Sequence, residues 1–237
     1  MIDINFNVFS DTPEGKDPDS HSPTLRKYHQ ILWNKKLPNG KNFKLDLDTP
    51  KLLHHKSDLG EFYLSSDQIT NTYSDVKKMS HIINQLTHDE INSFSSIRAT
   101  IAGHMIFPSK KIDNKMTING ARGWDRKIQD RFDLTLECIR LFYMKKSSPL
   151  SDVFQRYSSF FLLFDNFKGY VDFFLLQDLV DQDYASIKFW HPFTGFQDSP
   201  LPQNASEYRE YRNRVIKLLN GRNQRVLEFC RNMPTAQ

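Results

Sequence analysis

The stretch TINGARGWDRKIQDRFDLTLECIR, residues 117–140, carries most of what the sequence says about the fold and a site. Gly120 and Gly123 stand on either side of Arg122, and glycine lets the backbone turn sharply or approach a ligand closely. The segment therefore predicts a polar turn that leads into a helix, with Asn119 and Arg122 at the mouth of that helix.

The residues after this turn predict one long helix over 124–143. Its apolar side chains fall on two faces, which indicates a largely buried helix. A third face is charged, because acidic and basic residues recur there three or four positions apart. Unpaired charge is costly to bury, so we expect this face to pair internally or to line a cleft. Its members are Arg126, Asp130, Asp133, Glu137 and Arg140.

Two interpretations of the charged face remain open. As a site, it would converge with Arg122 on a shared hollow, in which Asp133 or Glu137 acts as a catalytic base or cation ligand and Arg122 holds an anion such as phosphate. As a structural feature, it would form a ladder of ion pairs that locks the helix to the sheet. The substrate-binding residues expected around the catalytic pair are Asn119, Arg122, Arg126 and Asp130.

The order of the predicted elements indicates an α+β fold, in which a mixed sheet from the N-terminal half packs against a mostly helical part over 124–237. Residues 2–9 alternate apolar and polar side chains, which predicts a half-buried strand. Residues 100–107 and 115–119 predict two paired strands. No linker divides the 237 residues, so we expect a single globular domain over 1–237.

Capping signals predict where several helices begin. Ser22 stands before a proline, and Thr87 and Asn204 each have a glutamate three residues later. These patterns are typical of N-caps, because the side-chain oxygen accepts a hydrogen bond from a free backbone N–H of the first turn.

Composition and charge limit the class of protein. The 25% of charged and 38% of hydrophobic residues are typical of a globular chain. Cys138 and Cys230 show neither a disulfide framework nor metal-ligand spacing. The chain start lacks signal-peptide features and no apolar run is long enough to span a bilayer, so we expect a cytoplasmic protein without a membrane partner.

The net charge of +4 arises within residues 205–231, which hold seven basic and three acidic residues. A basic helix on an otherwise balanced chain would contact RNA, DNA or an acidic partner. The alternative is a helix that is simply solvated on one face.

Several motifs resemble the signature of a family of bacterial proteins of unknown function. They are TINGARG (117–123) and DRFDLTLECIR (130–140), together with DPDSHSPTLRKYH (17–29) and GYVDFFLLQDL (169–179). The resemblance spans most of the chain. It implies a bacterial-type protein that forms one whole unit, and it implies no activity.

A second constellation is faintly similar to ADP-ribosyltransferases, whose Arg or His and Ser-rich strand end grip NAD. Here Arg26 and His29 are followed by Tyr63-Leu-Ser-Ser66. The chain departs from that pattern, because Arg26 and His29 are predicted to be helical and no Glu-x-Glu or Gln-x-Glu pair is present. A surface arginine beside a half-buried histidine is the structural alternative.

Two functions from different classes follow. The first is an intracellular enzyme acting on a nucleotide or nucleic acid, such as a toxin or phage-defence effector. The second is a non-catalytic binding or assembly module, whose protein partner would contact the aromatic-rich segment 160–174. The sequence identifies no cofactor.

Overall fold

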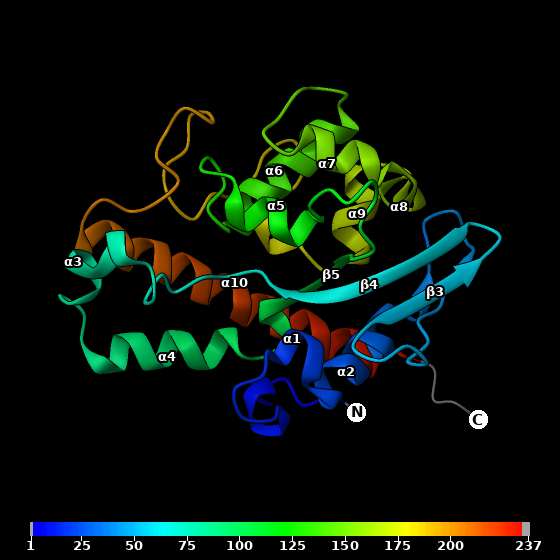
Figure 1. The fold of residues 1–237 in the computed structure, drawn as a ribbon, viewed down its shortest axis with the longest axis horizontal. Coiled ribbons are helices and arrows are strands. Elements are labelled where there is room, and N and C mark those ends of the chain that lie inside the picture. The colour runs from blue at the N-terminus through cyan, green and yellow to red at the C-terminus, as the bar shows by residue number, and fades with distance from the viewer. Residues whose placement is uncertain (1, 234–237) are drawn as a thin grey trace.

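The structure, a computed structural model, describes residues 2–233 (Figure 1). Short 3-10 helices span Val8–Asp11, Lys77–Met79, Ile101–Gly103, Leu162–Phe164 and Gln177–Leu179. The strands are β1 (Lys35–Lys36), β2 (Asn42–Phe43), β3 (Leu53–Ser57), β4 (Gly60–Gln68) and β5 (His104–Pro108). The α-helices are α1 (Pro18–His21), α2 (Pro23–Trp33), α3 (Ser80–Ile83), α4 (His88–Arg98), α5 (Ile118–Trp124), α6 (Phe132–Tyr143), α7 (Ser151–Arg156), α8 (Ser158–Phe161), α9 (Phe167–Phe173) and α10 (Ala205–Arg231).

The predicted α+β class is confirmed, although the strands form two small antiparallel sheets and not one mixed sheet. β1 pairs with β2, and β3, β4 and β5 form a second sheet in that order. Leu64 on the central strand β4 lies opposite Leu53 of β3 and Pro108 of β5. Side chains alternate between the two faces of a strand, so β4 presents Leu64 and Ser66 to one face and Ser65 and Asp67 to the other.

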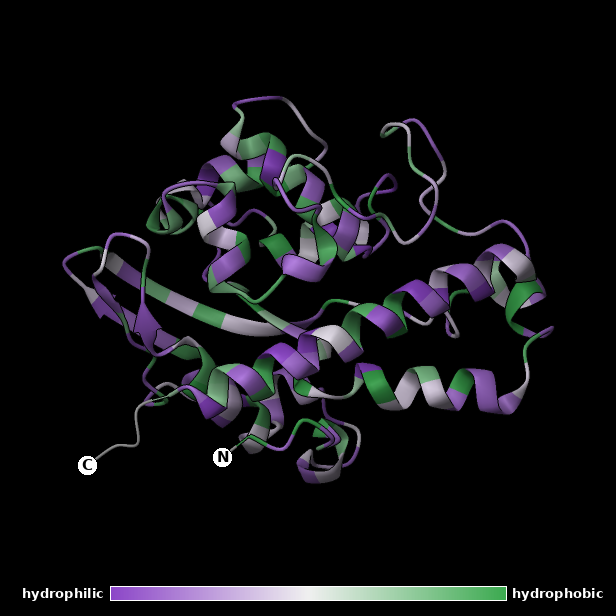
Figure 2. Ribbon diagram, turned by 180° about the vertical axis from the view of Figure 1, so that it is seen from behind, coloured by the Kyte–Doolittle hydropathy of each residue, from purple (hydrophilic) through white to green (hydrophobic). Residues whose placement is uncertain are grey.

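Helix α10 crosses almost the whole molecule behind β4, and α4 runs beside it (Figures 1 and 2). Helices α5 to α9 gather on one side of β4, while α1 and α2 lie on the other side. α10 begins where predicted, because the side chain of Asn204 accepts a hydrogen bond from the backbone N–H of Glu207 at 3.0 Å. The caps predicted at Ser22 and Thr87 are also confirmed, the latter as a full capping box.

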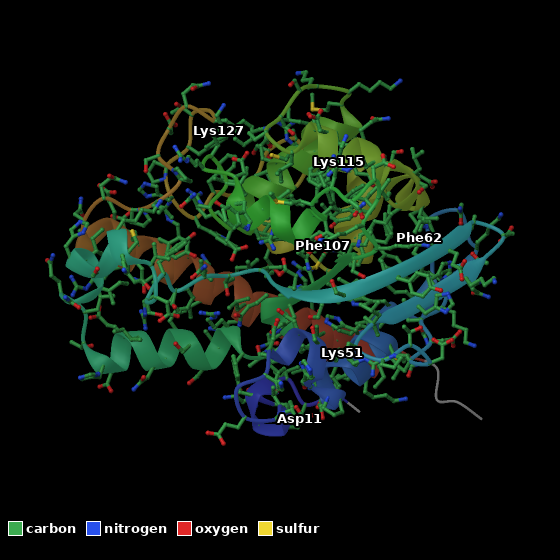
Figure 3. All side chains as sticks on the ribbon, in the orientation of Figure 1. Asp11, Lys51, Phe62, Phe107, Lys115 and Lys127 are labelled. Carbon is green, nitrogen blue, oxygen red and sulfur yellow. The ribbon has the colours of Figure 1, made fainter. Side chains whose placement is uncertain are left out.

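The aromatic segment 160–174 supplies the core between the sheet and helices α5–α9. Phe160 packs on Phe62 with ring centroids 5.8 Å apart, and Phe107 of β5 lies 6.3 Å from Phe132 of α6. Figure 3 labels Phe62 of β4 and Phe107 of β5. The expectation that this segment forms a partner surface is not met, since its rings are buried within the chain. The buried rings are Phe160, Phe161, Phe164, Phe167, Tyr170, Phe173 and Phe174.

Two strand predictions are wrong. Residues 2–9 do not form a strand, because Asp3 and Asn7 accept hydrogen bonds from backbone N–H groups two residues ahead and turn the chain. The segment predicted to pair with residues 100–107 begins a helix instead, since the Thr117 side chain caps α5 by accepting from the N–H of Gly120. β5 pairs with β4 in its place.

Among the helices of residues 2–233, none combines the length and the apolar character needed to cross a membrane.

Candidate functional site

The charged face predicted for one long helix does not exist. Residues 125–131 separate α5 from α6, and Gln129 and Asp130 adopt left-handed backbone with φ of 48° and 64°. The N–H of Asp130 donates to the carbonyl oxygen of Arg122 over 3.0 Å, which folds this turn back onto α5. The prediction of a continuous helix over 124–143 is therefore wrong, and its charged residues separate into three groups.

The first group surrounds Arg122, whose side chain is completely buried. Its guanidinium forms an ion pair with Asp67 of β4 and lies 3.3 Å from a carboxylate oxygen of Asp130. Nε donates to the hydroxyl of Thr135 at 3.1 Å, and the plane lies 5.6 Å from the Phe107 ring. Since protein groups occupy these donors, the geometry does not favour capture of a phosphate by Arg122.

Asp67 lies near three other carboxyl groups, those of Asp130, Asp19 and Asp17. Burial, reinforced by the charges of Asp130, Asp19 and Asp17, raises the pKa of Asp67 to about 8, and Arg122 opposes that shift. Burial and the nearby Asp19 carboxylate likewise raise the pKa of Asp17. Burial and the neighbouring carboxylates outweigh the attraction of Arg122, so Asp67 retains its proton at neutral pH.

His104 of β5 faces the same cluster. Its ring is fully buried, and Nδ1 donates to the carbonyl oxygen of Thr100 at 2.8 Å. Nε2 points toward a carboxylate oxygen of Asp19 at 3.7 Å, which is too long for a hydrogen bond. In the described part of the chain, neither of these two buried atoms has a hydrogen-bond partner.

Asn119 and His29, both predicted to bind substrate, contact adjacent residues of β4 whose side chains lie on opposite faces of the strand. The Asn119 amide nitrogen donates to the hydroxyl of Ser65 at 3.3 Å. His29 Nδ1 accepts from Trp33 at 3.0 Å, so its Nε2 carries the proton and donates to Ser66 at 3.0 Å. Burial lowers the pKa of His29, so the ring is a neutral link between α2 and the sheet.

Arg26 and Arg126 lie apart from these residues. Arg126 is exposed to solvent in the turn before α6. One Nη of Arg26 donates to three backbone carbonyls and thereby fixes the loop that precedes β3, so Arg26 has a structural partner set and not an open, NAD-gripping position. These carbonyls belong to Leu47, Thr49 and Leu52.

The second group is centred on Asp133, at the start of α6. Asp133 and Arg131 are completely buried and form an ion pair. Both carboxylate oxygens of Asp133 accept from Arg131, and Oδ2 also accepts from the backbone N–H of Trp190 at 2.9 Å. Arg131 donates to the carbonyl oxygens of His191 at 3.3 Å and of Pro200 at 2.8 Å. The pair therefore anchors residues 190–200 to α6.

The third group is the ion pair of Glu137 with Arg140, three residues further along α6. Both carboxylate oxygens of Glu137 accept from this guanidinium, at 2.7 Å and 2.8 Å. Among the five residues of the charged face, the Glu137–Arg140 pair is the only part of the predicted ion-pair ladder that forms. A catalytic role for Asp133 and Glu137 stays a prediction, and within residues 2–233 no three His, Cys, Asp or Glu side chains are placed to hold a metal ion.

The segment that Asp133 anchors forms one wall of a cavity of about 540 Å³, and α10 forms another. Arg214, Lys217 and Gly221 line it from one face of α10, at helical spacing. Asp178 is the acidic residue of the lining, and its carboxylate pairs with Arg225 at 2.6 Å. The cavity is therefore predominantly cationic. Its remaining lining residues are Leu179, Lys188, Phe189, Trp190 and Leu218.

Most of the basic residues of α10 have partners inside the chain. Arg209 pairs with Glu90 of α4 at 2.7 Å, and Arg225 pairs with Asp178. Arg222 is buried, where its guanidinium donates to backbone carbonyl oxygens such as that of Ala102. A broad basic stripe for nucleic acid is therefore not formed, and the cationic surface that remains includes the cavity.

The sequence alone did not reveal Asp67 or Lys188. Asp67 is one polar residue in an alternating strand, and its importance appears only when β4 lies beneath α5. Lys188 follows Ile187, which forms an isolated bridge with Val180, and no local pattern points to its place in the cavity. The cluster of basic residues on α10 was a usable signal, although it did not separate cavity residues from internally paired ones.

Comparisons with known proteins place the chain in a family without assigning an activity. No curated protein matches it, and no solved structure matches it. A family model described as a family of unknown function, DUF6994, matches residues 2–226. This match covers nearly all of the chain and agrees with the resemblance of its motifs, and the chain therefore belongs to this family of unknown function.

Proposed function

We propose that the chain binds a nucleotide, or a similar phosphorylated ring compound, in the cavity between residues 178–190 and α10. One observation carries the proposal: Lys188, Arg214 and Lys217 surround a single cavity that also has aromatic walls. Cationic side chains favour phosphate oxygens, and aromatic rings favour the flat face of a base.

The charge of the cavity supports an anionic ligand. Arg225 neutralises Asp178, and Arg214 has a weaker partner in Glu210 at 3.3 Å on the exposed surface. Lys188 and Lys217 form no ion pair with any residue of the described chain and are exposed. Two uncompensated ammonium groups that line one cavity favour an anionic ligand such as a phosphate.

The size and the aromatic wall fit the same class of ligand. A volume of about 540 Å³ lies within the usual range for small-molecule sites, roughly 300–1,000 Å³. Phe189 is partly exposed and rests against Phe193, with ring centroids 4.5 Å apart. Trp190 is held from behind through its backbone by Asp133. This gives Asp133 a positioning role with respect to the ligand.

If the protein is an enzyme that acts on a nucleotide, such as a toxin or defence effector, its substrate would bind in this cavity and not beside Arg122. The alternative is a non-catalytic module that binds the same nucleotide as a signal. Incubating the protein with the bound nucleotide and separating the products by chromatography discriminates the two, since only an enzyme consumes it.

Binding is tested by thermal unfolding in the presence of a panel of nucleoside mono-, di- and triphosphates. A ligand at a hundred times its dissociation constant stabilises the folded state by about 2.7 kcal/mol. For a chain of this length we expect the melting temperature to rise by roughly 5–10 °C with at least one nucleotide. No rise with any member of the panel contradicts the proposal.

A pair of charge-reversed variants localises the ligand. Lys188→Glu with Lys217→Glu should abolish the rise, while the melting temperature without ligand stays within about 2 °C because both side chains are exposed. Lys51→Glu with Lys127→Glu makes the same change in net charge at exposed lysines that do not line the cavity (Figure 3). This control should keep the rise.

A further inference from the structure

Trp124, the last residue of α5, has the most exposed large hydrophobic side chain among residues 2–233, with 78% of it open to solvent. The other two tryptophans, Trp33 and Trp190, are buried. Met116, just before α5, is also exposed, by 51%. Exposed apolar side chains that lie together on a surface are typical of binding sites, because leaving them in water costs free energy.

Trp124 and Met116 border the same hollow, which lies between α5 and α7 and has a volume of about 340 Å³. Pro149, Leu150 and Val153 add apolar surface to its lining. The guanidinium of Arg156, on α7, donates to the carbonyl oxygen of Met116 at 2.8 Å and holds the two sides of the hollow together. The hollow therefore offers a planar ligand an apolar place beside an exposed indole ring.

Basic side chains flank these two apolar residues in the chain. All five are exposed, and within residues 2–233 none of them forms an ion pair: Lys110, Lys111, Lys115, Arg126 and Lys127. The hydroxyl of Tyr157 on α7 donates to the carbonyl oxygen of Lys110 at 2.9 Å, so the loop before α5 is fixed against α7. Figure 3 shows Lys115 and Lys127 on the side of the molecule where α5 to α9 gather. The surface thus combines an exposed ring with uncompensated positive charge.

We propose that this surface binds single-stranded nucleic acid, with one base stacked on Trp124 and phosphates beside the flanking basic residues. An aromatic ring within a positively charged surface is how many proteins hold a single strand, since every base has a flat face and every linkage carries a negative charge. A duplex keeps its bases stacked on one another and offers none to the ring. The surface is separate from the nucleotide cavity beside α10, so neither proposal depends on the other.

The charges of this surface disfavour two other classes of partner. Lysine is depleted from protein–protein interfaces, whereas lysines predominate around Trp124. Asp125 and Asp152 also line the hollow, and their carboxylates are costly to bring against the apolar layer of a membrane. The same carboxylates can accept hydrogen bonds from the exocyclic amino groups of bases. A single strand therefore fits both the basic and the acidic side chains.

Tryptophan fluorescence measures the proposed stacking directly, because Trp124 is the exposed one of the three tryptophans. The protein is titrated with oligo(dC) and oligo(rC) of about twelve nucleotides, within the usual range of single-strand site sizes. We expect at least one of these strands to quench the emission and to shield Trp124 from acrylamide, and the comparison of the two distinguishes DNA from RNA. Absence of quenching with both strands overturns the proposal, as does equally tight binding of a duplex of the same length.

Substitutions of the ring test whether a base stacks on it. Trp124→Ala should weaken binding of a fluorescently labelled strand by about five- to a hundredfold, and Trp124→Phe, which keeps a ring, should retain most of the affinity. Leu162→Ala is the matched control, since Leu162 is 63% exposed and does not line the hollow. Its affinity should equal that of the unaltered chain. Unchanged affinity in Trp124→Ala would contradict the proposal.

Substitutions of the lysines test the contact with phosphates. Lys115→Gln with Lys127→Gln should weaken binding and flatten its dependence on salt, because each lost phosphate contact releases fewer counterions. Lys16→Gln with Lys51→Gln makes the same change in net charge at exposed lysines that do not flank the hollow. This second pair should bind as the unaltered chain does. Equal weakening in both pairs would show that net charge alone attracts the strand, which contradicts a site at Trp124.

Discussion

At the scale of single residues, Asp67 is where burial and charge conflict most strongly. Its carboxyl lies beside Arg122, but it is also surrounded by Asp17, Asp19 and Asp130. Burial and these three carboxylates outweigh the attraction of Arg122, so the folded state gains stability by binding a proton at Asp67. Asp67 is therefore the acidic group of this cluster whose protonation state at neutral pH differs from that of an ordinary aspartate.

This conflict predicts a pH-dependent stability. The pKa of Asp67 is raised to about 8 in the folded state, above its unfolded value of about 3.9, so its stabilising effect is complete below pH 4 and is lost as the pH rises toward 8. Between pH 5 and pH 8 the free energy of unfolding should fall by on the order of 1–3 kcal/mol more in the unaltered chain than in Asp67→Asn.

Denaturant unfolding at pH 5, 6.5 and 8 measures this difference. Asp113→Asn is the control, because it removes one exposed carboxylate and leaves the Arg122 cluster untouched. Its pH dependence should match that of the unaltered chain. Parallel pH profiles for Asp67→Asn and the unaltered chain would show that the cluster does not retain the proton.

At the scale of elements, α6 holds the wall of the ligand cavity through a buried ion pair and ends in a more exposed one. Asp133 binds Arg131 and the N–H of Trp190, all without access to water, whereas Glu137 and Arg140 pair on the partly exposed side of the helix. Removing one member of a buried pair leaves an uncompensated charge, and the cost is smaller where the remaining charge is partly exposed, as Arg140 is.

The two carboxylates of α6 should therefore respond very differently to amide substitution. Asp133→Asn should lower the free energy of unfolding by about 3 kcal/mol or more, and Glu137→Gln by about 1 kcal/mol or less. Hydrogen exchange should accelerate at the amides of residues 190–200 in Asp133→Asn alone. Equal losses of stability in Asp133→Asn and Glu137→Gln would contradict the different roles assigned to the two ion pairs of α6.

The sequence predicted elements well wherever local chemistry decides them. Side-chain caps at Ser22, Thr87 and Asn204 are visible in the sequence because their partners lie three residues away. The break between α5 and α6 was missed, since it contains no glycine or proline and helical spacing continues through it. The break depends on the contact of Asp130 with Arg122, which exists only after the turn has formed.

For the candidate site too, the sequence predicted only what residues close in sequence determine. Asn119, Arg122 and Asp130 do assemble as neighbours, because the turn that carries them is short. Their partner Asp67 is 55 positions from Arg122 in the sequence and comes from a strand, so no local pattern points to it. The predicted convergence of Asp133 and Glu137 failed because their positions relative to Arg122 depend on the turn at residues 125–131.

At the scale of the whole molecule, α10 connects the parts of the chain. It packs on α4, contacts the 3-10 helix at 177–179, and presents Arg214 and Lys217 to the cavity wall that α6 anchors. A ligand in this cavity would bridge α10 and residues 188–190. The proposed function therefore depends on the binding of an anion between α10 and residues 188–190.

A crystal structure grown with a non-hydrolysable ATP analogue at saturating concentration tests that dependence most directly. We expect electron density for phosphate groups within hydrogen-bonding distance of Lys188 and Lys217, with the base against Phe189. An empty cavity under these conditions, or the analogue bound at a different surface of the chain, would contradict it.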